Sequence, residues 1–178
     1  VLIDKAEDTE EAVNFLLSQP ILGVDTETRP SFSKGRGFQV SLLQVSTRDT
    51  CYLFRLHLTG ITPAIIRFLE DKTVPKVGLS WHDDLLQLHK RAEFKPGYFI
   101  ELQDEAKKFG LQDMSLQKLY ANLFHQKISK AQRLSNWEAS ELKDSQMAYA
   151  ATDAWCCINL YEELLRLKQE GDYELDEL

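Results

Sequence analysis

Two pairs of residues have spacings that could bring their side chains into one chemical site. One pair is two acids, and the other is a tyrosine with an acid. Asp25 and Glu27 follow the apolar run of residues 21–24. Because residues i and i+2 of a strand project from the same face, both carboxylates can enter one space. Tyr149 and Asp153 are four positions apart, which stacks them on one face of a helix. Hard divalent cations prefer such oxygen ligands, and the two pairs together suggest a metal-dependent nuclease. Neither pair alone is diagnostic.

A fourth carboxylate would complete such a site. Two-metal phosphoryl hydrolysis needs several carboxylates around cations that lie roughly 3.5 to 4 Å apart. Residues 76–88 offer a short apolar strand, a turn and then Asp83 and Asp84 at the start of a helix. Carboxylates are also common at helix starts as caps, so these residues by themselves leave a purely structural role open.

Length and composition predict one globular domain over residues 1–178. Hydrophobic residues make up 43% and charged residues 28% of the chain, and no stretch approaches the roughly 18 apolar residues of a membrane helix. We therefore expect no membrane association. The chain begins at Val1 without a signal-peptide pattern, which suggests trimming from a longer parent. The acidic end, residues 170–178, is expected to fray.

The cysteines favour a reducing compartment. Cys51, Cys156 and Cys157 form neither a disulfide framework nor a zinc pattern. The predicted location is cytoplasmic, or nuclear if the source is a eukaryote.

Charge is unevenly distributed. A formal net charge of -7 argues against a protein that coats nucleic acid through bulk positive charge. Residues 114–137 nevertheless contain no acid and carry Lys118, Lys127, Lys130 and Arg133 among Tyr120, Phe124 and Trp137. Residues 28–38 are also free of acids and carry Arg29, Lys34 and Arg36 beside Phe32 and Phe38. Such stretches could contact phosphates and bases. From composition alone, the alternative that both are simply solvent-exposed faces is about equally favoured.

The order of predicted elements indicates an α/β fold. Asp8 and Glu11 read as an N-cap with its return glutamate before a helix at 12–19. Strands are expected at 21–24, 40–45 and 51–56 as a meander, a helix from Thr62-Pro63 to about 69, and a buried strand at 76–79. Further helices are expected at 82–91, 104–109, 115–124 and 144–169, with a strand at 98–102. This order predicts a mixed sheet covered by helices.

Three motifs in this order resemble a known family. Asp25-x-Glu27, Val77-Gly78 with an aspartate six residues after the glycine, and Tyr149-x-x-x-Asp153 are similar to the motifs of the DEDD 3′-to-5′ exonucleases. The match is to the tyrosine-bearing branch, which includes ribonuclease D, the exonuclease domain of the Werner syndrome protein and the proofreading domain of DNA polymerase I. The resemblance covers roughly residues 21–165.

The resemblance implies a ribonuclease H-like mixed sheet flanked by helices, with two Mg²⁺ or Mn²⁺ ions at the edge of the sheet. Asp25, Glu27 and Asp153 would hold the first ion. Asp25 would bridge to the second with help from Asp84, and Tyr149 would orient the attacking water. No small-molecule cofactor beyond the metal ions is expected.

The second motif requires a choice between two adjacent acids. We choose Asp84 over Asp83, because Leu85 and Leu88 then fall one and four residues after the acid, as the family pattern suggests. Ser80 stands where many relatives carry a polar asparagine.

The sequence therefore predicts an enzyme that removes nucleoside monophosphates from nucleic acid 3′ ends. Phe32 or Phe38 could stack on the terminal base. The predicted nucleic-acid contacts are Thr28, Phe32, Lys34, Arg36, Phe38, Ser80, Lys130, Arg133 and Trp137.

DNA is the favoured partner, and RNA is possible. Residues 135–137 and the third motif look most like the Werner-type domain, and the additional helical domains usual in ribonuclease D relatives are not expected in this chain. The alternatives are a ribonuclease D-like exoribonuclease, a catalytically inactive module that binds nucleic acid or a partner protein, and a generic acidic metal-binding scaffold.

Overall fold

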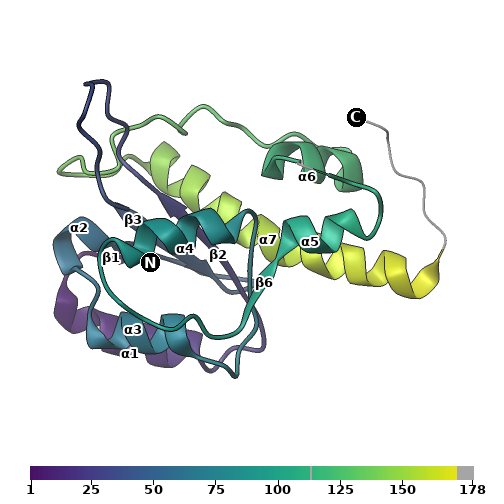
Figure 1. The fold of residues 1–178 in the computed structure, drawn as a ribbon, viewed down its shortest axis with the longest axis horizontal. Coiled ribbons are helices and arrows are strands. Elements are labelled where there is room, and N and C mark those ends of the chain that lie inside the picture. Colours follow the sequence, from purple (N-terminus) through teal and green to yellow (C-terminus); the bar gives the residue numbers. More distant parts are fainter. Residues whose placement is uncertain (113, 172–178) are drawn as a thin grey trace.

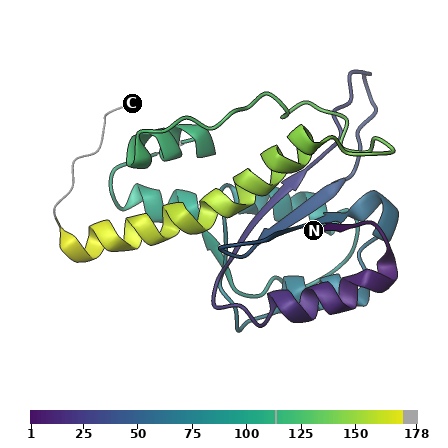
Figure 2. The same cartoon turned by 180° about the vertical axis from the view of Figure 1, so that it is seen from behind.

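A six-stranded mixed sheet with helices on both faces forms the body of the molecule (Figures 1 and 2). The structure is a computed structural model that describes residues 1–112 and 114–171. Strand order across the sheet is β1-β4-β3-β2-β5-β6. The predicted α/β class is confirmed. The predicted acidic tail lies, from residue 172 onward, outside the described residues.

The centre of the sheet is the predicted meander, confirmed by antiparallel pairing of β2 with β3 and of β3 with β4. Parallel strands extend it on either side. The strands are β1 (Leu2–Ile3), β2 (Leu22–Glu27), β3 (Leu42–Ser46), β4 (Cys51–Arg55), β5 (Lys76–Gly78) and β6 (Phe99–Glu101). β1 was not predicted, because only its pairing with β4 makes this two-residue segment a strand.

Eight helical segments accompany the strands within the described residues. They are η1 (Ala6–Asp8), α1 (Thr9–Leu16), α2 (Leu56–Thr59), α3 (Pro63–Glu70), α4 (Trp81–His89), α5 (Leu102–Lys107), α6 (Leu116–Phe124) and α7 (Asp144–Glu170). The Thr62 cap of α3 is confirmed, because its hydroxyl accepts from the Ile65 amide. Asp8 is the N-cap residue of α1, as predicted, but it also ends the 3-10 turn, and its side chain makes no cap hydrogen bond within the described chain.

The two faces of the sheet have different cores. Leu22 and Val24 of β2 point to the side covered by α1 and α3, where the larger core cluster lies. The opposite side is covered by α7 together with α5 and α6, as Figures 1 and 2 show. Side chains alternate along β2, so residues 23, 25 and 27 face α7.

Helix α7 lies directly on β2 at Gly23, where the Ala154 carbonyl leaves no room for a side chain. This close approach, near the start of β2, fixes how the middle of α7 lies across that strand. Both elements carry predicted site residues, so the crossing decides whether those residues meet. Among residues 1–112 and 114–171, no helix has the length and apolar content needed to cross a membrane.

Candidate active site

Three of the predicted carboxylates converge. Asp25 and Glu27 at the end of β2 and Asp153 of α7 each offer an oxygen, and these oxygens lie within 4.8 Å of one another. Asp153 is buried, while Asp25 and Glu27 are half-buried. The packing of α7 on β2 therefore brings the strand pair, Asp25 and Glu27, together with Asp153 of the helix pair.

Burial and mutual repulsion favour the protonated forms of these acids. Burial, followed by the charge of Asp153, raises the pKa of Asp25, against a smaller lowering by the Thr26 amide, which donates to Asp25 Oδ1 at 2.8 Å. Burial and then the charges of Asp25, Asp153 and Asp84 raise the pKa of Glu27. Burial raises the pKa of Asp153 to about 7. A cation between the three groups would reverse this repulsion.

The donor set fits hard divalent cations. All three side chains supply carboxylate oxygens, the ligands that Mg²⁺ and Mn²⁺ prefer. Asp153 Oδ1 is buried and has no hydrogen-bond partner within the described residues. A buried acceptor without a donor is costly, and a bound cation would satisfy it.

Asp84 and Asp83 differ sharply in their surroundings. Asp84 is half-buried, and its Oδ1 accepts a hydrogen bond from the Thr26 hydroxyl. Burial and then the charge of Asp25 raise its pKa. Asp83 is exposed to solvent. Asp84 thus faces the cluster of Asp25, Glu27 and Asp153 but is not one of the three acids whose oxygens converge.

Tyr149 lies one helical turn before Asp153 and is also buried. Its ring stacks on Trp137 with centroids 6.1 Å apart. Burial and the charge of Asp153 raise the pKa of Tyr149 above its ordinary value, so the phenol stays protonated and can donate a hydrogen bond. Trp137 is 0% exposed and packs its ring against Tyr149, so its contact with nucleic acid stays a prediction.

Comparison with known proteins identifies this arrangement. The sequence profile described as 3′-5′ exonuclease matches residues 1–168. The chain belongs to the 3′-5′ exonuclease family. The resemblance seen in the sequence motifs is thereby confirmed.

Relatives of this exonuclease domain include a protein named as an exonuclease and helicase and a protein named as a ribonuclease. The bifunctional 3′-5′ exonuclease/ATP-dependent helicase WRN of Mus musculus is 29% identical over 150 residues, covering 81% of this chain and 11% of that protein. Ribonuclease D of Gluconacetobacter diazotrophicus is 31% identical over 176 residues, covering 96% of this chain and 44% of that protein. The domain therefore spans less than half of the length of these curated relatives.

Solved structures share the fold. The Nibbler EXO domain of Aedes aegypti superposes with a TM-score of 0.83 at 20% identity, covering 97% of this chain and 90% of that one. Ribonuclease D of Escherichia coli gives a TM-score of 0.83 at 18% identity, covering 96% of this chain and 45% of that one. The predicted ribonuclease H-like fold of an exonuclease domain is confirmed.

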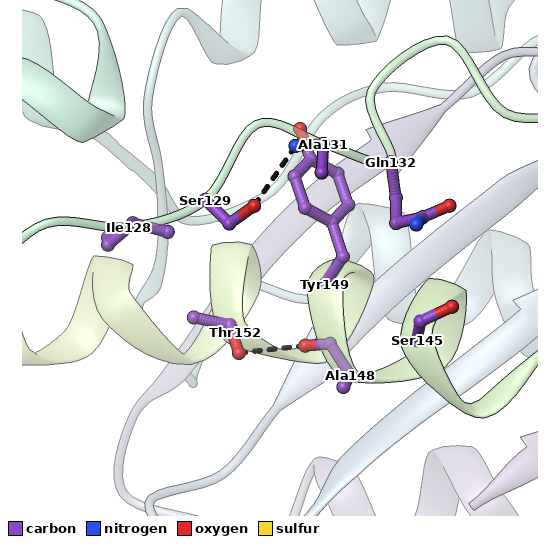
Figure 3. Close-up of a pocket in the computed structure, with 8 residues that line it drawn as sticks. All are labelled: Ile128, Ser129, Ala131, Gln132, Ser145, Ala148, Tyr149 and Thr152. Atoms are coloured by element: carbon purple, nitrogen blue, oxygen red, sulfur yellow. Dashed lines mark hydrogen bonds between the residues drawn. The ribbon is translucent and has the colours of Figure 1, made fainter.

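A cavity of about 340 Å³ adjoins Tyr149 in the exonuclease domain. Figure 3 shows the Tyr149 ring rising from α7 toward Ala131 on the segment that follows α6. The rest of the lining is Ile128, Ser129 and Gln132 from that segment and Ser145, Ala148 and Thr152 from α7. Most of these side chains are small, and the Tyr149 ring is the one aromatic group among the lining residues that the structure describes.

Two segments that carry predicted nucleic-acid contacts lie near each other (Figures 1 and 2). The β2–β3 loop and the segment between α6 and α7 are joined at their bases, where the Ser41 hydroxyl donates to Glu138 Oε2 at 3.0 Å. Phe32 is 87% exposed. The remaining exposed positions are Thr28, Lys34, Arg36, Phe38, Lys130 and Arg133.

Phe38 and Ser80 are less free than the sequence suggested. The guanidinium of Arg29 lies 4.5 Å from the centre of the Phe38 ring, so one face of that ring is already occupied. Ser80 is half-buried, and its amide donates to Glu101 Oε2 at 2.7 Å. The Ser80 backbone at the start of α4 is therefore hydrogen-bonded to the end of β6.

Sequence reasoning missed Gln44. This fully buried residue of β3 pairs with Asp25 across the sheet. Its Nε2 donates to the Ala150 carbonyl of α7 at 3.3 Å, and its side chain lowers the pKa of Glu27, against the larger effect of burial. The available signal was a glutamine inside the apolar run of residues 40–45, since polar residues in buried strands need specific partners.

Proposed function

We propose that this domain hydrolyses the terminal phosphodiester bond at the 3′ end of a nucleic acid strand and releases nucleoside monophosphates. The main support for this proposal is that carboxylate oxygens of Asp25, Glu27 and Asp153 lie within 4.8 Å of one another. The family match over residues 1–168 supports the reaction type.

In this proposal, Asp25, Glu27 and Asp153 hold one Mg²⁺ or Mn²⁺ ion, and Asp25 and Asp84 hold a second. When bound, the two ions supply Lewis acidity to the scissile phosphate and to the attacking water. The donor chemistry supports this assignment, because every residue in the set offers carboxylate oxygens. Burial, and then the charges of the neighbouring acids, raise the pKa values of Asp25 and Glu27, and a bound cation would offset that repulsion.

Tyr149 is assigned the orientation of the attacking water. Its raised pKa keeps the hydroxyl protonated, so it can hold water by a hydrogen bond without ionising. The stack against buried Trp137 restricts the ring and hence the direction of the hydroxyl. Tyr149 acts here through position, as effective catalysis requires well-aligned reactants.

The cavity beside Tyr149 is assigned to the 3′-terminal base. Its volume of about 340 Å³ and the Tyr149 ring in its lining suit a planar group that stacks without base-specific hydrogen bonds. The exposed cations Lys34, Arg36, Lys130 and Arg133 are assigned to phosphates farther along the strand. Their contribution should weaken as salt increases.

DNA is the proposed substrate, supported by the Werner-type character of the third motif. The second candidate is RNA, favoured by the 31% identity to ribonuclease D over 96% of this chain. A 2′-hydroxyl contact would separate them.

The test is hydrolysis of matched single strands of DNA and RNA, labelled at the 3′ nucleotide, with Mg²⁺ or Mn²⁺ and with chelator. We expect labelled mononucleotide from DNA faster than from RNA, and none in chelator or with Asp25→Asn. Faster release from RNA would reverse the substrate assignment. No release from either strand by the wild-type domain would refute the exonuclease proposal.

A further inference from the structure

The first residues of α4 adopt an unusual backbone conformation. Ser80, the N-cap residue, has φ 52° and ψ 35°, in the left-handed region that favours glycine. Its side chain makes no cap hydrogen bond to α4 within the described chain. Strained conformations of this kind persist where surrounding contacts hold them, so another group must stabilise this turn.

Glu101 supplies that contact. It ends β6 and pairs with Gly78 of β5, two residues before Ser80. Its Oε2 accepts a hydrogen bond from the Ser80 amide at 2.7 Å and one from the Gln103 amide at 3.3 Å. A single carboxylate oxygen therefore joins the start of α4 to the start of α5.

The orientation of α4 determines where Asp84 points. Trp81, the first residue of α4, packs tightly on Gly78, where a Cβ would lie 3.1 Å from the Trp81 Cβ. The ring of Trp81 also stacks on Phe99 of β6, with centroids 5.2 Å apart. One turn later, Asp84 accepts from the Thr26 hydroxyl of β2. Any rotation of the first turn would therefore move Asp84 relative to Asp25.

We propose that Glu101 is a positioning residue for Asp84. By holding the Ser80 amide, it fixes the first turn of α4 and keeps the Asp84 carboxylate aimed at the cluster of Asp25, Glu27 and Asp153. This inference rests on the proposed function, in which Asp84 helps to hold a cation. Residues that orient metal ligands typically contribute 10- to 100-fold to affinity or activity.

Two substitutions at Glu101 separate this role from simple capping of α5. Glu101→Gln keeps a side-chain oxygen at the same reach and removes the charge. Glu101→Ser keeps a good N-cap for α5 but is too short to reach the Ser80 amide. A positioning role requires that glutamine preserves function and serine does not. Glu105→Gln is the matched control, because Glu105 is an acid of α5 that pairs with Lys108 instead.

The experiment measures kcat, KM and Mn²⁺ binding by calorimetry for each variant, in the wild-type background and with Asp84→Asn. We expect Glu101→Ser to lower kcat and Mn²⁺ affinity on the order of tenfold with KM unchanged. Glu101→Gln and Glu105→Gln should stay within about twofold of wild type. Combined with Asp84→Asn, Glu101→Ser should add less than about twofold, because coupled residues are not additive.

Equal losses from Glu101→Ser with and without Asp84→Asn would overturn the proposal, since the effect would not pass through Asp84. Wild-type behaviour of Glu101→Ser, or a loss in Glu101→Gln as large as in Glu101→Ser, would also overturn it. The Mn²⁺ measurement separates this inference from the proposed function. A wild-type domain that cleaves nothing refutes the exonuclease proposal, while the calorimetric comparison still decides the role of Glu101.

Discussion

Gly23 of β2 lies so close to Ala154 of α7 that a Cβ at residue 23 would come within 2.0 Å of the Ala154 carbonyl oxygen. Asp25 stands two residues after Gly23 on the same face of the strand, and Asp153 directly precedes Ala154. The absence of a side chain at residue 23 is therefore a condition for bringing these two carboxylates together.

Gly23→Ala should push α7 away from β2 and damage both stability and activity. Overpacking of this kind typically costs about 1 to 3 kcal/mol. Thermal unfolding and 3′-end hydrolysis would measure the two effects. Gly37→Ala is the control, because a Cβ there meets nothing within 4 Å among the described residues. Wild-type activity in Gly23→Ala would show that the site tolerates a displaced helix.

Asp25→Asn and Asp153→Asn should each nearly abolish hydrolysis while leaving the domain folded. Each substitution removes one negatively charged carboxylate from the cluster of Asp25, Glu27 and Asp153. In chelator the variants should melt at or above wild type near pH 8, because a buried repelling charge is gone. Calorimetry and melting curves with Mn²⁺ would check this. A normal Mn²⁺-induced rise in Tm in either variant would argue against its role as a ligand.

Asp84→Asn and Asp83→Asn should behave differently. Asp84 accepts from Thr26 and senses the charge of Asp25, while Asp83 is exposed. We expect Asp84→Asn to lose most hydrolysis and Asp83→Asn to remain close to wild type in a direct comparison of initial rates. The opposite result would shift the second motif by one residue. Full activity in both would remove that motif from the site.

Tyr149→Phe should slow hydrolysis by on the order of 10² and leave substrate binding nearly unchanged, because a positioned proton-donating group contributes about this much. The ring and its stack on Trp137 remain in this variant. Single-turnover rates and binding of DNA to the Asp25→Asn background would separate chemistry from affinity. Unaltered turnover would reduce Tyr149 to a packing residue.

The stability of the metal-free domain should fall as pH rises. Acids in the unfolded chain ionise near pH 4, whereas burial raises the pKa of Asp153 to about 7 and also raises those of Asp25 and Glu27. The folded domain then binds more protons between these values. Its extra stability is complete below the unfolded pKa and is lost as pH rises through the folded pKa.

Melting curves in chelator between about pH 5 and about pH 8 would test this trend. Saturating Mn²⁺ should raise the Tm most at the upper end, where the acids are ionised. A hundredfold excess over Kd corresponds to about 2.7 kcal/mol of stabilisation. The Asp25→Asn variant serves as the reference for the pH dependence that does not come from Asp25. A wild-type Tm in chelator that rises over this range relative to the Tm of that variant would contradict the raised pKa values.

Local covalent geometry explains what the sequence by itself determined. The two-residue period of a strand places Asp25 and Glu27 on one face, and the helical i, i+4 spacing does the same for Tyr149 and Asp153. Both depend only on neighbours along the chain. The family motifs and the α/β element order are of the same kind, since order and spacing are properties of the sequence.

Packing between distant segments decided the rest. Three contacts join separate segments of the chain. Trp137 packs on Tyr149, Asp84 rather than Asp83 faces Asp25, and the Ser80 amide donates a hydrogen bond to Glu101. No local period encodes such contacts. They arise when α7 and α4 settle on the sheet at positions fixed by Gly23 and Gly78, because close packing admits few arrangements of large side chains.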